Sequence, residues 1–232
     1  PRETGWGVPR VAAAGEQLML RLGYDRFGAQ GGDWGSMVTL RLGAFHTDHL
    51  AGVHVNMPLV VPSTPPEEMT ETEAAAVAGL AHYMTRDNGY STQQSTRPQT
   101  LGYGLADSPV GQMAWIVEKF WAWTDCDGDP RNALTADELL DNVMVYWLNN
   151  AAASSARLYW ESFSQIDFSP IEVPSAISIF PHEIFRCSRR WAEGRFTDLR
   201  HFNEVDRGGH FAAFEQPELF VDELRSAFRG MR

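Results

Sequence analysis

The sequence feature that most constrains the fold is the stretch QGGDWGS at residues 30–36, which separates a short apolar run from a helix-like one. Residues 26–30 are bounded by glycines and predict a strand, whereas apolar residues recur at helical spacing over residues 37–45. Glycine allows backbone conformations that crowd other residues. We therefore expect a sharp turn from a strand directly into a helix, with Asp33 at its centre.

The flanking segments place this turn in a parallel sheet covered by helices. Residues 11–22, rich in Ala and Leu, predict a helix, and residues 51–57 predict the next strand. Helix, strand, turn, helix and strand in succession are typical of an α/β layer. Strand patterns return at residues 176–180 and 199–205, and an amphipathic helix begins at Pro217.

The middle of the chain has a helical pattern instead. After a proline-rich segment, the acidic, Ala-rich residues 67–84 predict a helix. A further helix is expected over residues 109–123, and a capping-box pattern at residues 135–138 precedes a helical run that reaches residue 160. This part of the chain is therefore expected to form a helical insertion between two parts of the α/β layer.

Composition excludes several classes of protein. The 232 residues carry 19 basic and 30 acidic side chains, a net charge of −11, without a Lys/Arg run, which disfavours nucleic acid and anionic membranes as partners. No apolar run reaches the roughly 18 to 20 residues of a membrane span. Cys126 and Cys187 lie far apart, so we expect no disulfide framework, no zinc and a reducing, cytoplasmic location. No metal or cofactor is expected, and a homodimer stays open.

The turn has the form G-x-D-x-G, the pattern of the nucleophile elbow of α/β-hydrolases with aspartate in the place of serine. From these residues alone, a plain glycine-rich turn in which Asp33 caps the helix stays open. If Asp33 is a nucleophile, its chemistry is narrow, because a carboxylate that attacks a saturated carbon leaves an ester that water can cleave. Asp33 therefore indicates epoxide opening or halide displacement.

The fold class that follows is α/β, an α/β-hydrolase fold with an inserted helical cap or lid. We expect residues 1–60 to form the first part of the core with the elbow, residues 61–169 the lid, and residues 170–232 the return of the core with the acid and the histidine.

The remaining members of such a site are expected near the C-terminus. His210, in RGGHF, follows the last predicted strand, and we predict that it is the base. Glu183 follows the strand at residues 176–180, where an acid could hold the imidazole. We expect His46 and His49 to be surface residues and His54 to be structural. Competitors of Glu183 for the acid position are Asp198, Glu204 and Asp206.

Three stretches, MLRLGYDRFGAQGGDWGS, DSPVGQMAWIVEKFWAWT and RGGHFAAFEQPELF, resemble the microsomal-type epoxide hydrolases, which include the juvenile hormone epoxide hydrolases of insects. The resemblance runs over nearly the whole chain. It implies that a hydrophobic epoxide is converted to a vicinal diol, with Asp33 as alkylating nucleophile, His210 as water-activating base and Glu183 as charge-relay acid. It further implies that Tyr90 and Tyr159 protonate the epoxide oxygen.

Trp34 follows the nucleophile, so its backbone N–H is expected to be half of an oxyanion hole, and its side chain to line the pocket. The family's H-G-x-P segment, which supplies the other N–H, does not occur before the elbow, and the chain begins with Pro1 rather than Met. With only four predicted strands, we expect an N-terminally truncated chain whose first strand has lost a neighbour and whose oxyanion hole is half built.

Two other activities stay open from the sequence. A haloalkane dehalogenase also uses Asp and His, but holds halide with Trp or Asn donors. A catalytically incomplete α/β-hydrolase could act as a ligand-binding module. Two local patterns are interpreted as structural: residues 125–129 as a lid loop rather than a calcium site, and Trp115, Phe120, Trp121 and Trp123 as helix packing, with a lesser expectation that one of them lines a substrate tunnel.

Overall fold

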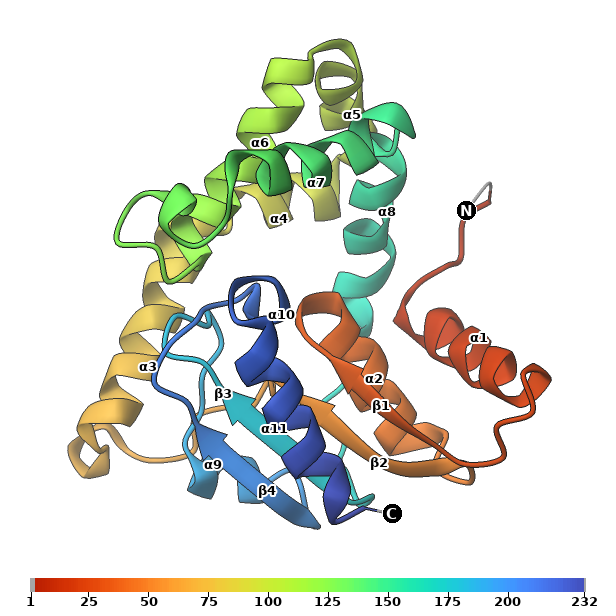
Figure 1. Ribbon diagram of the computed structural model, residues 1–232, viewed down its shortest axis with the longest axis vertical. Helices are drawn as coiled ribbons and strands as arrows, with labels where there is room; N and C mark the ends of the chain where they lie inside the picture. Colours follow the sequence, from red (N-terminus) through yellow and green to blue (C-terminus); the bar gives the residue numbers. More distant parts are fainter. Residues whose placement is uncertain (1–2, 232) are drawn as a thin grey trace.

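The computed structural model describes residues 3–231 and contains a parallel sheet with helices on both faces (Figure 1). The strand order is β1-β2-β3-β4, so each strand pairs with the next one in the chain and β1 lies at one edge. The four predicted strands are confirmed to within one or two residues at their ends. They are β1 (Phe27–Gly31), β2 (Leu50–Val55), β3 (Ser175–Ile179) and β4 (Leu199–Glu204).

Helices cover the two faces of the sheet because neighbouring strand residues point in opposite directions. Ile177 of β3 packs in the main apolar core with residues of α2 (Asp33–Phe45) and α9 (Arg189–Glu193). The preceding Ala176 packs instead against the end of α11 (Pro217–Arg229) and the Met231 that follows it. The strands β3, buried throughout, and β2, buried except at Ala51, are therefore the centre of the fold, and α1 (Val8–Arg21) packs outside α2.

The helical insertion lies above the sheet, next to the elbow and α10 (Figure 1). Its helices α4 to α8 form one layer, whereas α3 runs down beside the sheet. The division into core and lid at residues 61 and 169 stays a prediction. The helices of the insertion are α3 (Glu71–His82), α4 (Gly89–Thr96), α5 (Pro98–Asp107), α6 (Pro109–Trp123), α7 (Ala136–Leu148) and α8 (Ala152–Ser162); α10 spans Ala212–Glu215.

Side-chain caps explain where the predicted lid helices begin. Thr70 and Glu73 form a capping box at α3, and Ser108 accepts the Gly111 N–H at 3.0 Å at α6. The predicted capping box at residues 135–138 is confirmed at α7. Short helical turns occur at Pro66–Glu68, Pro130–Asn132 and Phe163–Gln165 (3₁₀) and at Tyr83–Asp87 (π).

Two parts of the helical pattern differ from expectation. The run predicted to reach residue 160 as one helix is broken into α7 and α8, because Asn150 adopts a φ of 47°, which an α-helix cannot contain. The helices α4 and α5 were not predicted, since their polar and glycine-containing sequences show no clear apolar stripe.

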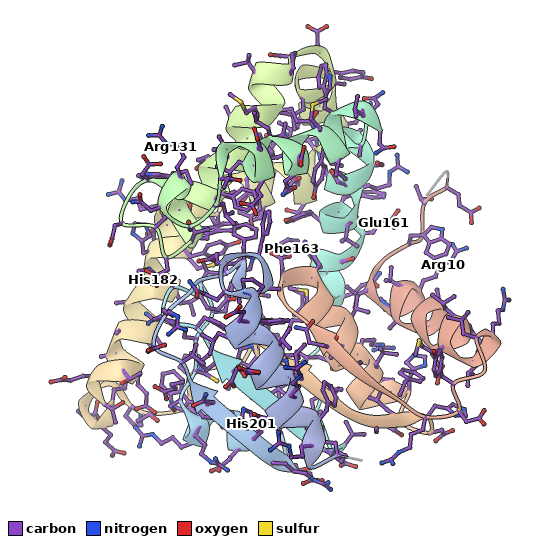
Figure 2. All side chains as sticks on the ribbon, in the orientation of Figure 1. Arg10, Arg131, Glu161, Phe163, His182 and His201 are labelled. Carbon is purple, nitrogen blue, oxygen red and sulfur yellow. The ribbon has the colours of Figure 1, made fainter. Side chains whose placement is uncertain are left out.

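Polar contacts join distant parts of the chain. Glu161 of α8 accepts the backbone N–H of Gly5 at 2.9 Å, and Figure 2 shows Glu161 facing the segment that carries Arg10. Cys126 and Cys187 are buried and free. Among residues 3–231, no helix is long and apolar enough to cross a membrane, and no cluster of three or more metal-binding side chains occurs.

Candidate active site

The predicted turn is a strained elbow at the first residue of α2, where Asp33 has a φ of 48°. A Cβ atom at Gly31 would collide with the backbone of Gly35, and one at Gly32 would lie 2.7 Å from Oδ1 of Asn56. Glycine is therefore required at position 31, whereas a side chain at position 32 would displace the end of the Asn56 side chain. Gly35 itself has open space around it, and it is the backbone of this residue that approaches Gly31.

The structure brings Asp33, His210 and Glu183 into one hydrogen-bonded row. His210 Nε2 lies 2.8 Å from Asp33 Oδ2, and its Nδ1 lies 2.9 Å from Glu183 Oε1. The other oxygen of Asp33, Oδ1, accepts the backbone N–H of Trp34. The His210 and Glu183 side chains are almost completely buried, whereas 41% of the Asp33 side chain is exposed, on the side that lines a cavity. One end of the row is thus open to a ligand.

The competing acids lie elsewhere. Asp198 pairs with Arg200 at 2.8 Å and Asp206 with Arg207 at 3.1 Å, both at the surface, and Glu204 is exposed. Of the four acids considered for this position, only Glu183 has a hydrogen bond to His210.

Contacts with the lid fix the loop that carries His210. The backbone N–H of His210 donates to the backbone carbonyl of Trp123, the last residue of α6, at 2.9 Å. A Cβ atom at Gly209 would collide with the same carbonyl, so glycine is needed there. Asp125 accepts the Gly208 N–H at 2.9 Å and lies 3.2 Å from His182 Nε2. The acidic loop at residues 125–129 therefore docks the lid on the histidine loop, close to the labelled His182 (Figure 2).

The charges within the row reinforce one another. Burial would raise the pKa of Asp33, but the hydrogen bond and positive charge of His210 and the N–H of Trp34 lower it below its ordinary value. Burial would likewise lower the pKa of His210, yet the two carboxylates at its ring nitrogens raise it to about 10. The two carboxylates therefore favour the protonated form of His210.

This arrangement predicts that Asp33→Asn lowers the pKa of His210. The substitution removes a negative charge 2.8 Å from Nε2, so the imidazolium loses one of the two charges that stabilise it. The change should appear as a downward shift of the His210 midpoint by about one pH unit or more in an NMR titration of the imidazole protons. A midpoint that does not move would show that Glu183 alone sets the charge of His210.

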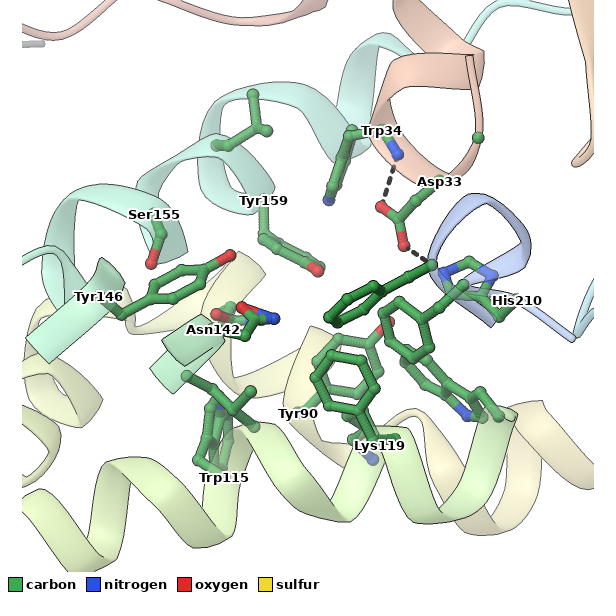
Figure 3. Close-up of a pocket in the computed structure, with 18 of the residues that line it drawn as sticks. Asp33, Trp34, Tyr90, Trp115, Lys119, Asn142, Tyr146, Ser155, Tyr159 and His210 are labelled. Atoms are coloured by element: carbon green, nitrogen blue, oxygen red, sulfur yellow. Dashed lines mark hydrogen bonds and ion pairs between the residues drawn. The ribbon is translucent and has the colours of Figure 1, made fainter. Parts of the chain in front are cut away.

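Two tyrosines face this row across the cavity (Figure 3). The rings of Tyr90 and Tyr159 are 5.8 Å apart, and Tyr159 packs edge-on against Trp34 with centroids 4.9 Å apart. Burial, followed by nearby groups that include Asp33, raises the pKa of both phenols. Both are therefore protonated at neutral pH and able to donate a hydrogen bond.

The cavity has a volume of about 920 Å³ and is bounded mainly by lid helices and by the two loops that carry Asp33 and His210. Trp115, Phe120 and Trp123 line it, whereas Trp121 is 55% exposed. That one of these aromatic residues lines a substrate tunnel stays a prediction. The side chain of Trp34 also lines the cavity.

Sequence reasoning missed a group of residues that lies behind Tyr90. The hydroxyl of Tyr83 lies 3.2 Å from that of Tyr90. The ammonium of Lys119 lies 4.6 Å from the centre of the Tyr90 ring and 3.1 Å from Asp87 Oδ1, and the indole N–H of Trp123 donates to the same carboxylate. A lysine on the apolar face of α6 was the available signal, because a charge in such a place needs a partner.

The other histidines lie outside the row. His54 is fully buried in β2 with Nε2 3.0 Å from Ser178, which supports the structural interpretation. His46 is only partly exposed and lies 2.9 Å from Glu16 of α1, and His49 contacts the carbonyl of Asp25 at 2.9 Å. His46 therefore ties the end of α2 to α1, and His49 ties one loop to another.

Comparison with known proteins gives consistent similarities. No protein-family model matches the chain. It is 51% identical over 234 residues to a protein of Stigmatella aurantiaca named "Putative epoxide hydrolase", covering all of this chain and 53% of that protein. It is 35% identical over 256 residues to epoxide hydrolase 1 of Sus scrofa, covering 97% of this chain and 56% of that protein. The chain thus spans about half the length of these relatives.

Solved structures show the same similarity in three dimensions. The structure matches the crystal structure of juvenile hormone epoxide hydrolase from the silkworm Bombyx mori with a TM-score of 0.89 and 30% identity, over 99% of this chain and 60% of that one. The Aspergillus niger epoxide hydrolase matches with a TM-score of 0.88 and 30% identity, over 100% and 60% of the two chains.

Proposed function

Because this chain is related along its whole length to epoxide hydrolases and has their α/β-hydrolase fold, we propose that its site converts a hydrophobic epoxide to a vicinal diol. The observation that carries the proposal is the hydrogen-bonded row Asp33–His210–Glu183, whose open end faces two protonated tyrosines across an apolar cavity. A hydrolysis by this route needs only water as co-substrate.

In the first step, Asp33 Oδ2 attacks a carbon of the epoxide ring and the C–O bond to the ring oxygen breaks. The ring oxygen takes a proton from Tyr90 or Tyr159, because an alkoxide is a poor leaving group at neutral pH. This step leaves an ester on Asp33 and a phenolate. A departing halide would need no such proton, so the paired phenols favour epoxide chemistry over dehalogenation.

In the second step, water cleaves the ester. Esterified Asp33 no longer carries the charge that raises the pKa of His210, so His210 releases its proton to the phenolate and becomes a neutral base. It then takes a proton from water, and the hydroxide attacks the ester carbonyl. The N–H of Trp34 stabilises the oxyanion at Oδ1, and departure of the diol restores the carboxylate and the imidazolium.

The test is incubation of the chain with styrene oxide in heavy-oxygen water. In a first turnover with excess protein, the diol should contain no label, because its new oxygen comes from Asp33, and the Asp33 peptide should gain heavy oxygen in mass spectra. With excess substrate, later turnovers should release labelled diol. Label in the diol from the first turnover would mean direct attack by water and would refute the ester mechanism.

A further inference from the structure

An ion pair between Asp87 and Lys119 lies behind Tyr90 in the lid. The ammonium of Lys119, on α6, donates to Oδ1 of Asp87 at 3.1 Å and to its backbone carbonyl at 3.3 Å. Only 10% of the Lys119 side chain and 15% of the Asp87 side chain are exposed. Burial of two charges is costly, and a hydrophobic pair of similar volume is often at least as stable. Stability alone is therefore a weak reason for a charged pair at this place.

Both members of the pair act on the surroundings of the Tyr90 ring. Lys119 Nζ lies 4.6 Å from the centre of this ring, and Figure 3 shows Lys119 on the far side of Tyr90 from Asp33. The second carboxylate oxygen of Asp87, Oδ2, accepts the indole N–H of Trp123. Trp123 in turn packs edge-on against Tyr90, with ring centroids 5.3 Å apart. The Tyr90 ring thus contacts two side chains that are both hydrogen-bonded to Asp87.

The backbone places Asp87 in an irregular turn. Residues Tyr83–Asp87 form a π-helical turn between α3 and α4, with a hydrogen bond from the N–H of Asn88 to the carbonyl of Tyr83 at 2.9 Å. Turns of this kind are rare and are frequent at functional sites. The turn also carries Tyr83, whose hydroxyl lies 3.2 Å from that of Tyr90. One irregular segment therefore supports both the ring and the hydroxyl of Tyr90.

The hydrogen bonds explain why a carboxylate is suited to position 87. Its two oxygens accept hydrogen bonds from two different donors, Lys119 and Trp123. An amide has a single acceptor oxygen and would turn its NH₂ group towards one of these donors. Asparagine at position 87 should therefore release either the ammonium or the indole, and with it one side of the support of Tyr90.

We propose that the Asp87–Lys119 pair is a positioning pair for Tyr90, which holds its hydroxyl where it donates a hydrogen bond to the ring oxygen of the epoxide. This inference rests on the proposed function and deepens it. Asp87 lies outside the cavity lining and acts through its neighbours. Its effect should fall on ring opening, because that is the step in which the ring oxygen gains a proton.

The test is a double-mutant cycle on the rate of ring opening. Styrene oxide is mixed with excess protein, and its loss in the first turnover is followed by chromatography. Asp87→Asn should slow this loss by about tenfold or more, both in the wild-type background and in Tyr159→Phe. In Tyr90→Phe no hydroxyl remains to be positioned, so the same substitution should change the rate by less than about twofold. Equal slowing in every background would show a general loosening of the lid and would overturn the proposal.

A binding measurement tests the same coupling without turnover. Styrene oxide and cyclopropylbenzene have nearly the same shape, but a CH₂ group replaces the ring oxygen in the latter. Their dissociation constants are measured in the Asp33→Asn background through quenching of tryptophan fluorescence, since Trp34 and Trp115 line the cavity. Adding Asp87→Asn should reduce the preference for the epoxide by about threefold or more when Tyr90 is present, and should not reduce it in Tyr90→Phe. An unchanged preference with Tyr90 in place contradicts the proposal.

Two further variants make the test independent of any single substitution. Lys119→Gln removes the cation over the Tyr90 ring and keeps an N–H donor for Asp87, so it should show the same dependence on Tyr90. Asp87→Glu keeps the charge and both acceptor oxygens, so it should retain more of the rate than Asp87→Asn does. Thermal melts identify any variant that has not folded.

The matched control is Asp107→Asn, which removes the charge of an exposed acid at the end of α5. It should leave the rate of ring opening within about twofold of wild type. If neither Asp87→Asn nor Lys119→Gln has a larger effect than this control, the pair has no part in the positioning of Tyr90.

The two proposals fail separately. A chain whose preference for the epoxide depends on Asp87 through Tyr90, but which forms no diol, refutes the proposed function and keeps the positioning pair. A chain that forms diol and opens the ring equally fast with and without the Asp87 carboxylate refutes the positioning pair and keeps the proposed function.

Discussion

Replacement of Asp33 by asparagine is expected to lower the rate of diol formation by at least about 10³-fold. The amide has nearly the shape of the carboxylate, and asparagine tolerates the positive φ of 48° at this position better than alanine does, so the elbow should remain folded. What is lost is the anionic oxygen proposed to attack the ring carbon, and an amide oxygen is a far weaker nucleophile. Diol released in single- and multiple-turnover reactions, separated by chromatography, measures the effect.

The matched control is Asp48→Asn, which alters an exposed acid in the loop between α2 and β2. It should leave the rate within about twofold of wild type, since surface substitutions of this kind change little. Intact mass must show that the asparagine introduced by Asp33→Asn has not hydrolysed back to aspartate in the preparation. A folded Asp33→Asn variant that keeps about a tenth of the wild-type rate would exclude Asp33 as the nucleophile.

The elbow could be predicted from the sequence because its determinants are local. The crowding that requires Gly31 arises from the backbone of residue 35, only four residues away, so its cause is local. The placement of Glu183 and His210 followed from the chain order of an α/β-hydrolase site, in which the acid and then the histidine come after the nucleophile near the C-terminus. The structure brings both side chains together, and their catalytic roles remain predictions.

The lid could not be predicted to the same depth because its determinants are long-range. Nothing local in the polar sequence of α4 reveals that Tyr90 packs against Trp123, 33 positions along the chain, with centroids 5.3 Å apart. The π-helical turn at Tyr83–Asp87 likewise has no clear signature, although it brings Tyr83 and Asp87 behind that tyrosine. Helix pairs in the lid are held by tertiary packing, which overrides weak propensities.

His210→Gln tests the second half of the proposed cycle, and its expected effect differs in kind from that of Asp33→Asn. Glutamine can still donate a hydrogen bond towards Asp33 Oδ2, so the attack on the ring should continue. It cannot accept a proton from water, so hydrolysis of the ester should slow by at least about 10³-fold. The protein is then expected to accumulate the ester, with one equivalent of epoxide consumed in a burst and little diol released.

Mass spectrometry of the quenched reaction distinguishes the two steps, because the peptide that contains Asp33 should gain the mass of the epoxide in His210→Gln and not in Asp33→Asn. The Glu183→Gln variant should accumulate less ester than His210→Gln does. It keeps His210 as the base and loses only the buried negative charge 2.9 Å from Nδ1 of His210. The control His49→Gln changes a histidine whose ring contacts a loop carbonyl, and it should turn over normally. Slow turnover of His210→Gln with no modified peptide would place His210 in the alkylation step instead, because a base needed only for hydrolysis cannot prevent the ester from forming.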